Sequence, residues 1–186
     1  MAMSDYAASW YGQSIQVELD PSPRLEGHHR ADVCVIGGGV TGCSAALHLA
    51  RRGHRVRLLE AERIAWGASG RAGGHVMPGL GTGMDTVAKG IGKDAARAVW
   101  DMSLEAVQMI DDLVREYGIP CDLRWGYVHT AIRQRHMRMY RDLVEQMASE
   151  YGYHDMQLLD REQVRERARS DYYIGGIHEP RAGRLH

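Results

Sequence analysis

Three glycines at the spacing of a phosphate-binding turn carry the clearest chemistry in this sequence. Gly37, Gly39 and Gly42 form the pattern G-x-G-x-x-G. In such a turn the first glycine permits a tight bend, the second lets the backbone approach a pyrophosphate, and the third lets a helix pack closely on a sheet. Glu60 follows about twenty residues later, where an acid in this pattern accepts hydrogen bonds from ribose hydroxyls. Together these residues predict a dinucleotide site.

The elements that must hold this site follow one another in the required order. Residues 32–36 form an apolar, β-branched run that predicts a strand, residues 43–52 predict a helix ending at Gly53, and residues 55–59 predict a second strand. The helix N-terminus would offer free N–H groups and a partial positive charge to phosphates. A lone glycine turn is weak evidence. Because strand, helix and acid all agree here, we favour a dinucleotide-binding βαβ unit over an α/β turn that binds nothing.

A second stretch of small residues, 61–75, follows the acid. It is too rich in glycine for a helix and lacks the alternation of a strand, so it predicts a loop. Small residues let a backbone approach a large ligand closely. Ser69 offers a hydroxyl and Arg71 a guanidinium, both suited to phosphate. The alternative is a flexible solvent loop, which Trp66 and the Gly73-Gly74 pair make less favourable.

Composition limits the classes of partner and the compartment. The formal net charge is -1 and the sequence pI is about 6.8, so we expect neither nucleic acid nor an anionic membrane as partner. Residues 1–27 lack a long apolar run, so no signal peptide or membrane span is expected. Cys34 and Cys43 are expected to be buried thiols, and three cysteines without C-x-x-C favour a reducing compartment. We therefore predict a cytoplasmic protein.

No metal site is predicted, because the His28-His29 pair is better explained as a solvated surface pair. His129 is expected to be a half-buried polar residue of a strand rather than a catalytic one. The remaining expected elements are an extended arm over 1–30 rather than a regular element, a glycine-rich stretch without periodic structure over 79–92, helices over 94–117 and 134–151, a strand over 126–132, a helix capped by Asp160 with Gln163 at the capping-box position and running to 168, and strand-like residues 172–186.

At residues 35–42, 59–61 and 66–74 the sequence resembles the D-amino-acid oxidase/glycine oxidase family of FAD-dependent oxidoreductases, and within it the γ-glutamylputrescine oxidases. The shared features are the Rossmann turn, the segment G-A-S-G-R-x-G-G, an aromatic-rich N-terminal arm and the glycine-punctuated residues 175–186. The resemblance implies an α/β fold, with a Rossmann-type FAD-binding domain and the start of an α+β substrate domain. We expect an N-terminal arm over 1–30, an incomplete FAD-binding domain over 31–124, and the truncated start of the substrate domain over 125–186.

The resemblance also implies which residues contact FAD. Residues of the turn would line the pyrophosphate, Glu60 would hold the adenosine ribose, and the small-residue loop would run past the phosphates to the flavin ring. Ala72 and His75 stand where Asn and Gln are usual in γ-glutamylputrescine oxidases. The expected cofactor-binding residues are Gly37, Gly39, Val40, Thr41, Gly42, Glu60, Ala61, Arg63, Ala68, Ser69, Ala72, Gly73, Gly74 and His75.

The implied activity is FAD-dependent oxidation of an amine similar to γ-glutamylputrescine, as in putrescine catabolism, giving an imine and then an aldehyde, with oxygen reduced to hydrogen peroxide. The partners would be a small-molecule amine and oxygen, and no catalytic residue is identified. Because members of this family are considerably longer, the resemblance implies an N-terminal fragment. Two alternatives stay open, an inactive flavin-binding remnant and an FAD-dependent amino-acid dehydrogenase with another electron acceptor. The small-residue loop beyond Glu60 argues against a nicotinamide-dependent dehydrogenase.

Overall fold

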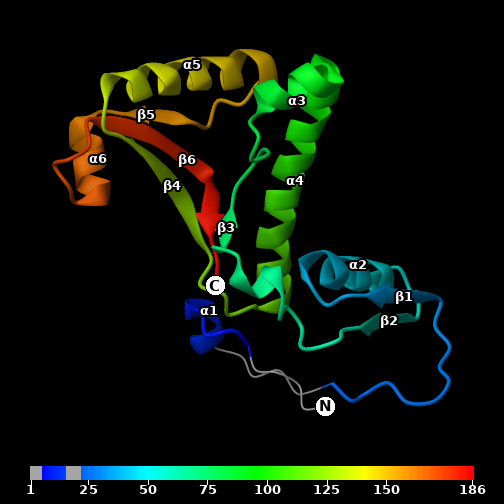
Figure 1. Ribbon diagram of the computed structural model, residues 1–186. Coiled ribbons are helices and arrows are strands. Elements are labelled where there is room, and N and C mark those ends of the chain that lie inside the picture. Colours follow the sequence, from blue (N-terminus) through cyan, green and yellow to red (C-terminus); the bar gives the residue numbers. More distant parts are fainter. Residues whose placement is uncertain (1–5, 16–21) are drawn as a thin grey trace. The chain divides into compact units, whose positions relative to one another are not determined.

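The computed structural model describes residues 6–15 and 22–186, which belong to two compact units divided between Gly73 and Gly74 (Figure 1). None of the helices within these ranges combines the length and the hydropathy that crossing a membrane requires. The domain boundaries expected near residues 30 and 124 remain predictions.

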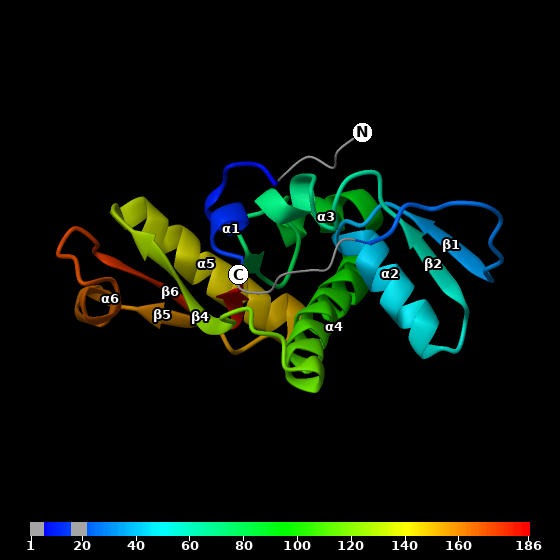
Figure 2. The same cartoon turned by 90° about the horizontal axis from the view of Figure 1, so that it is seen from below.

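The first unit contains the expected βαβ element. β1 (Val33–Ile36) and β2 (Val56–Leu59) pair in parallel, with Val33 opposite Val56, and α2 (Val40–Arg51) connects them. Figure 2 shows the two strands side by side with α2 next to them. The helix ends before Gly53, whose φ of +87° is a left-handed conformation that glycine adopts without steric cost. The predicted order of strand, turn, helix and strand is confirmed.

The prediction that Cys34 is buried is wrong. Successive side chains of a strand point to opposite faces, and α2 packs on the face that carries Val33 and Val35. Cys34 and Ile36 point away from it, and Ile36 is 86% exposed. Cys43, on the first turns of α2, is partly buried, and this burial raises the pKa of its thiol. The composition of β1 is typical of a strand buried on both faces, but in the structure this strand is covered on one face.

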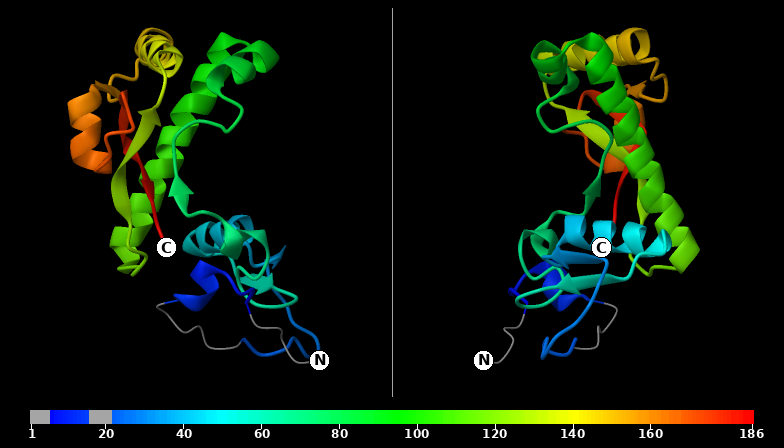
Figure 3. Two further views of the ribbon diagram at one scale, coloured as in Figure 1. Left: turned by 60° about the vertical axis from the view of Figure 1, so that its left-hand side comes forward. Right: turned by 90° about the vertical axis from the view of Figure 1, so that its right-hand side faces the viewer.

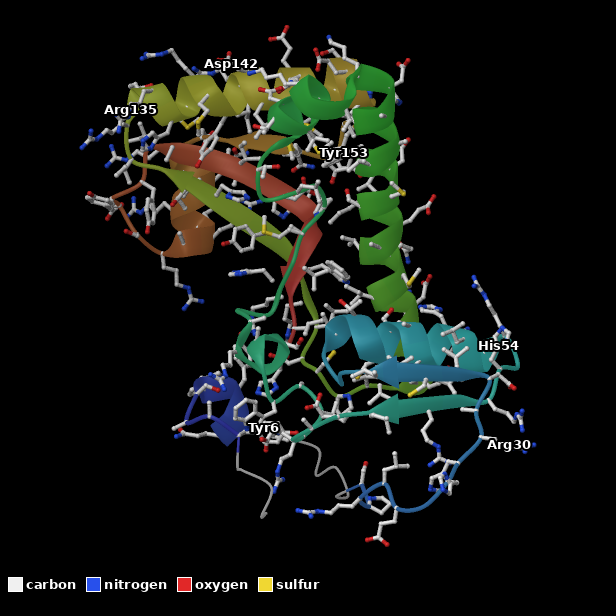
Figure 4. The ribbon with its side chains drawn as sticks, turned by 45° about the vertical axis from the view of Figure 1, so that its right-hand side comes forward. Tyr6, Arg30, His54, Arg135, Asp142 and Tyr153 are labelled. Carbon is white, nitrogen blue, oxygen red and sulfur yellow. The ribbon has the colours of Figure 1, made fainter. Side chains whose placement is uncertain are left out.

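The N-terminal arm is more regular than expected. It contains one helical turn, α1 (Trp10–Gln13), which Ser9 caps because its hydroxyl accepts a hydrogen bond from Gly12 N at 3.1 Å. A serine before a helical turn is a local signal for its N-cap, and Ser9 carries it in this arm. Tyr6 lies in the same segment, and its hydroxyl donates to the carbonyl of Ile64 at 2.9 Å (Figure 4). The rest of the predicted arm, at 1–5 and 16–21, lies outside the described residues.

The stretch 61–75 is a packed loop rather than a flexible one. It contains a single turn of 3-10 helix, η1 (Ala68–Arg71), that the sequence did not predict. Ala65 N donates to the carbonyl of Gly38 at 2.8 Å, which ties the loop to the glycine turn. Ala65 itself has a φ of +60°, and a Cβ at Gly70 would collide with its carbonyl oxygen. Small residues are thus required for the loop to close on itself.

The second unit is built around one long strand, β6 (Gly175–Arg184), which pairs antiparallel with all the other strands of its sheet. On one side β6 pairs with β4 (Arg124–Ala131), and along its other side with β5 (Gln157–Leu159) and with the short β3 (His75–Val76). The strands expected near 126–132 and 172–186 are confirmed.

Helices cover both faces of this sheet. α6 (Arg161–Ala168) lies on the face of Gly176, next to Val164, and α5 (Gln134–Tyr151) lies on the opposite face, with Met137 against Gly175. Figure 3 shows the sheet between α6, in orange, and the long α4 (Lys93–Tyr117), in green. The core beside α4 consists of Met84, Ala96, Trp100, Met147, Tyr151 and Tyr153.

Three of the four helices described in the second unit, α4, α5 and α6, agree with the sequence-based prediction. α4 ends at Gly118 in a left-handed conformation, α5 has the expected bounds, and Asp160 caps α6 through the expected capping box with Gln163. The helix α3 (Met84–Ile91) was missed. The glycines around it suggested a structureless stretch, whereas Val87 and Ala88 form an apolar face that packs on the core.

Candidate cofactor site

The glycine turn is sterically determined at its first and last glycines. Gly37 has a φ of +102°, and its N–H donates to the carbonyl of Leu59 at 2.7 Å, which joins the end of β1 to the end of β2. A Cβ on Gly42 would collide with the carbonyl oxygen of Gly37 and would lie 3.4 Å from Val35 Cγ1. The first turn of α2 therefore packs against β1 at a distance that only glycine permits, as the sequence predicts.

Ser69 completes the N-terminus of α2. Its Oγ accepts a hydrogen bond from Val40 N at 3.0 Å, and a Cβ on Gly39 would lie 2.9 Å from that Oγ. The N–H groups of Thr41 and Gly42 belong to the same first turn, where a helix has no carbonyl partners of its own. A serine hydroxyl, free N–H groups and the positive end of the helix dipole therefore meet where the sequence places a pyrophosphate.

Glu60 is held by two backbone groups. Its Oε2 accepts a hydrogen bond from Gly38 N at 2.6 Å, and its Oε1 accepts one from Glu62 N at 3.0 Å. The bonds from Glu62 and Gly38 lower the pKa of the carboxyl group, so it is ionised at neutral pH. Each carboxylate oxygen keeps a further lone pair. Glu60 can therefore accept hydrogen bonds from two hydroxyls while it stays attached to the turn.

Gly38 contacts Glu60, although it is not among the residues expected from the sequence. It is buried, and a Cβ at this position would lie 2.6 Å from Ile64 Cδ1 and 3.1 Å from Glu60 Oε2. The G-x-G-x-x-G pattern leaves its second position open, so nothing in the motif marks this glycine. Its run of three consecutive glycines was the available signal.

Among the other expected residues of the first unit, Arg63 places its guanidinium 5.8 Å from the centre of the Tyr6 ring. Arg71 stacks on Trp66 at 5.2 Å, which leaves it less suited to phosphate than the sequence suggested. Ala68 begins η1 beside Ser69. Ala61, Ala72 and Gly73 lie on exposed backbone of the same loop.

Gly74 and His75 belong to the second unit. Gly74 has a φ of +67°, and its carbonyl accepts a hydrogen bond from Leu185 N at 2.8 Å. His75 is exposed, pairs with Arg184 across β3 and β6, and places its ring edge-on to Tyr127 with 5.6 Å between centroids. The structure thus brings together the glycine turn, Ser69 and Glu60, whereas the roles of Gly74 and His75 toward a cofactor remain predictions.

Comparison with known proteins identifies the family of this chain. Residues 32–186 match the model of the family described as FAD dependent oxidoreductase. The chain belongs to this family, whose cofactor is FAD.

Relatives are similar over the whole chain. It is 38% identical over 185 residues to the probable oxidoreductase OrdL of Haemophilus influenzae and 35% identical over 184 residues to the γ-glutamylputrescine oxidoreductase of Escherichia coli, covering 100% and 99% of this chain. In both cases the match spans 43% of the relative's length. The solved L-amino acid deaminase of Proteus myxofaciens shares the fold, with a TM-score of 0.71 and 17% identity over 91% of this chain and 36% of that one. The α/β fold and the family resemblance are confirmed.

The residues present fit the adenosine diphosphate part of FAD. The turn has no side chain between Gly37 and Gly39, so a pyrophosphate can approach the backbone at the N-terminus of α2. Ser69 can donate its own O–H to a phosphate oxygen while it accepts from Val40 N, because a hydroxyl has one donor and two acceptor sites. Glu60 is ionised, and each of its oxygens keeps a lone pair that a ribose hydroxyl could use.

Proposed function

We propose that the protein oxidises an amine similar to γ-glutamylputrescine. In this reaction a primary amine, oxygen and water give an aldehyde, ammonia and hydrogen peroxide, with an imine as the species that water hydrolyses. Bound FAD would supply the two-electron oxidation chemistry. The proposal is supported above all by the joint placement of Gly39, Ser69 and Glu60 in the first unit.

The residues of the first unit would bind and orient the cofactor. The backbone between Gly37 and Gly42, with Ser69, would hold the pyrophosphate, and Glu60 would hold the ribose. A dinucleotide fixed at these points has its reactive end in a defined place, which lowers the entropic cost of reaction with a bound amine. The 35% identity to the E. coli γ-glutamylputrescine oxidoreductase supports the choice of amine.

A second candidate is a chain that binds FAD without turnover. The observation that favours it is the uncovered face of the β1–β2 sheet, where Ile36 is 86% exposed and Cys34 is exposed. Exposed apolar strands promote association with other chains, which competes with a productive active site.

One experiment separates these functions. The purified chain is mixed with FAD, its flavin absorption is measured after gel filtration, and peroxide is assayed with γ-glutamylputrescine, putrescine, glycine, sarcosine and D-amino acids. Bound flavin with peroxide from γ-glutamylputrescine is the expected result. Bound flavin that is reduced by an amine without peroxide indicates a dehydrogenase, bound flavin without reduction indicates the inactive candidate, and absence of bound flavin contradicts the cofactor site.

A further inference from the structure

A buried carboxylate that forms no ion pair with any residue the structure describes lies in the sheet of the second unit. Glu179, on β6, is 2% exposed. Its Oε1 accepts hydrogen bonds from the Tyr153 hydroxyl and, at 3.0 Å, from Arg181 N. Its Oε2 is buried and has no hydrogen-bond partner among the described residues. The Arg181 side chain is engaged elsewhere, in an ion pair with Asp155 at 3.0 Å. Both donors to Glu179 are therefore neutral groups.

The surroundings fix this carboxylate in place. The rings of Tyr153 and of Trp100 in α4 pack in a T-shaped arrangement with 5.0 Å between centroids. Figure 4 shows Tyr153 beside α4. Burial, together with the bond to Glu179, raises the pKa of Tyr153, so the phenol stays protonated and remains a donor. A carboxylate held on one oxygen by two donors presents its second oxygen in a fixed direction. Buried charges in proteins are normally paired, because an unpaired charge is costly to desolvate. A cation next to this second oxygen would offset that cost.

Two partly exposed rings lie beside Glu179. Tyr127 of β4 is directly opposite Glu179 in the strand pairing, and His129 is two residues further on the same face. Their rings are 4.9 Å apart. Burial lowers the pKa of His129 in spite of the nearby Glu179, so at neutral pH the imidazole is uncharged and does not supply the missing cation. A carboxylate flanked by aromatic faces is an arrangement that binds ammonium groups.

We propose that Oε2 of Glu179 binds an ammonium group of the substrate, which enters past the rings of Tyr127 and His129. Because Oε2 is buried, a primary ammonium at the end of an alkyl chain reaches it only when the partly exposed side chains of Tyr127 and His129 move aside. This inference rests on the proposed amine oxidation and narrows its substrate class.

The bound ammonium is not the group that is oxidised, because an amine must be unprotonated to lose hydride from the adjacent carbon. The substrate therefore carries two amino groups, one that reacts and one that Glu179 holds as a cation. Diamines and aminoacyl derivatives of diamines belong to this class, whereas a simple monoamine does not.

The test is calorimetric titration of the chain, without flavin, with putrescine and with its neutral analogue 1,4-butanediol. Glu179→Gln keeps the shape and the acceptor for Tyr153 but removes the charge. Glu166→Gln on the exposed surface of α6 is the matched control. We expect putrescine to bind Glu179→Gln at least tenfold more weakly than the wild type and Glu166→Gln, with no change for butanediol. Equal putrescine affinity in all three proteins, or no preference of the wild type for putrescine over butanediol, overturns the proposal.

A second measurement uses only the wild type and holds if Glu179→Gln does not fold. The imidazole of His129 is titrated by NMR with and without saturating putrescine. A cation at Oε2 adds a positive charge beside His129, so its pKa falls further. An unchanged His129 titration contradicts the site. Because neither measurement involves flavin, failure to form peroxide counts against the proposed function alone, and full peroxide formation by Glu179→Gln with diamines counts against this subsite alone.

Discussion

Asp32 and Arg55 fasten the beginning of β1 to the beginning of β2. The carboxylate Oδ2 of Asp32 accepts hydrogen bonds from Arg55 N at 2.8 Å and from Arg55 Nε at 3.1 Å, and Oδ1 accepts one from Nη2 at 2.7 Å. These bonds fix the parallel register in which Val33 lies opposite Val56. The glycine turn and Glu60 lie at the other ends of the same two strands, so this register also sets the geometry of the cofactor site.

This pair makes the stability of the first unit depend on pH. The hydrogen bonds from Arg55 lower the pKa of Asp32 from 3.8 to about 2. Because the folded pKa is depressed, the contribution is complete above pH 4 and is lost as the pH falls toward 2. We expect the difference in unfolding free energy between wild type and Asp32→Asn to shrink over this window. A difference that stays constant from pH 6 to 2 contradicts the assignment.

Gly42→Ala is expected to destabilise the first unit, because its Cβ would overlap the carbonyl oxygen of Gly37. Forced overpacking of this kind costs about 1–3 kcal/mol, and more where backbone must move. Gly67→Ala is the matched control, since a Cβ there meets nothing within 4 Å. Denaturant titration of both variants tests this prediction. Equal unfolding midpoints for Gly42→Ala and Gly67→Ala would show that α2 can shift away from the turn.

Glu60→Ala is expected to weaken FAD binding about ten- to hundredfold, the value of a charged hydrogen bond of about 1.5–3 kcal/mol. Glu60→Gln keeps an acceptor for Gly38 N and removes only the charge, so it should bind FAD with intermediate affinity. Flavin fluorescence quenching gives the affinities, and circular dichroism confirms that the variants are folded. FAD affinity that is the same in all three proteins would place the ribose elsewhere.

Gly39→Val is expected to abolish FAD binding. Even a Cβ at this position would lie 2.9 Å from Ser69 Oγ, and the branched side chain would cover the first turn of α2. Gel filtration of the variant with FAD should show no flavin absorption with the protein peak. Retention of stoichiometric flavin would show that no pyrophosphate lies against this turn.

Asp160→Ala is expected to cost about 0.5–2 kcal/mol of unfolding free energy, the usual value of a lost N-cap. Asp160 Oδ1 accepts from Gln163 N at 2.8 Å, and Gln163 Oε1 accepts from Asp160 N at 3.0 Å, so the variant loses both bonds or strains the second. Asp160→Asn should restore most of the stability because its amide oxygen can cap the helix. A thermal melt in which the alanine variant matches the wild type would show that packing of Val164 alone holds α6.

Local signals explain which parts of the fold could be predicted. The βαβ unit, α5 and the cap of α6 are each encoded by a short stretch of sequence. Hydrophobic periodicity predicts the helices, Gly53 marks the end of α2, and the Asp160–Gln163 pair marks the start of α6. α3 was missed because its glycine-rich neighbourhood outweighed an apolar face that only its packing on the core of the second unit reveals. The exposure of Cys34 could not be predicted, since it depends on which face of the strand α2 covers.

The site shows the same division between local and long-range information. Gly37, Gly42 and Glu60 were found because their spacing along the chain is itself the signal. Ser69 was expected at the phosphates, but its role as the cap of α2 depends on a contact across 29 residues of sequence. Glu179 had no signal at all, because its interest lies in the missing partner of one oxygen and in Tyr153, which folding brings to it.

The central position of β6 sets an order of events during synthesis on the ribosome. The strands β3, β4 and β5 are all made before β6, yet within the described residues β6 is the strand with which each of them pairs. His75 must therefore wait for Arg184 to emerge, while the βαβ element of the first unit can pair as soon as β2 is complete. A nascent chain therefore exposes β4 without this partner from residue 131, where β4 ends, until β6 begins at residue 175, and unpaired strands of this kind are prone to aggregation during synthesis.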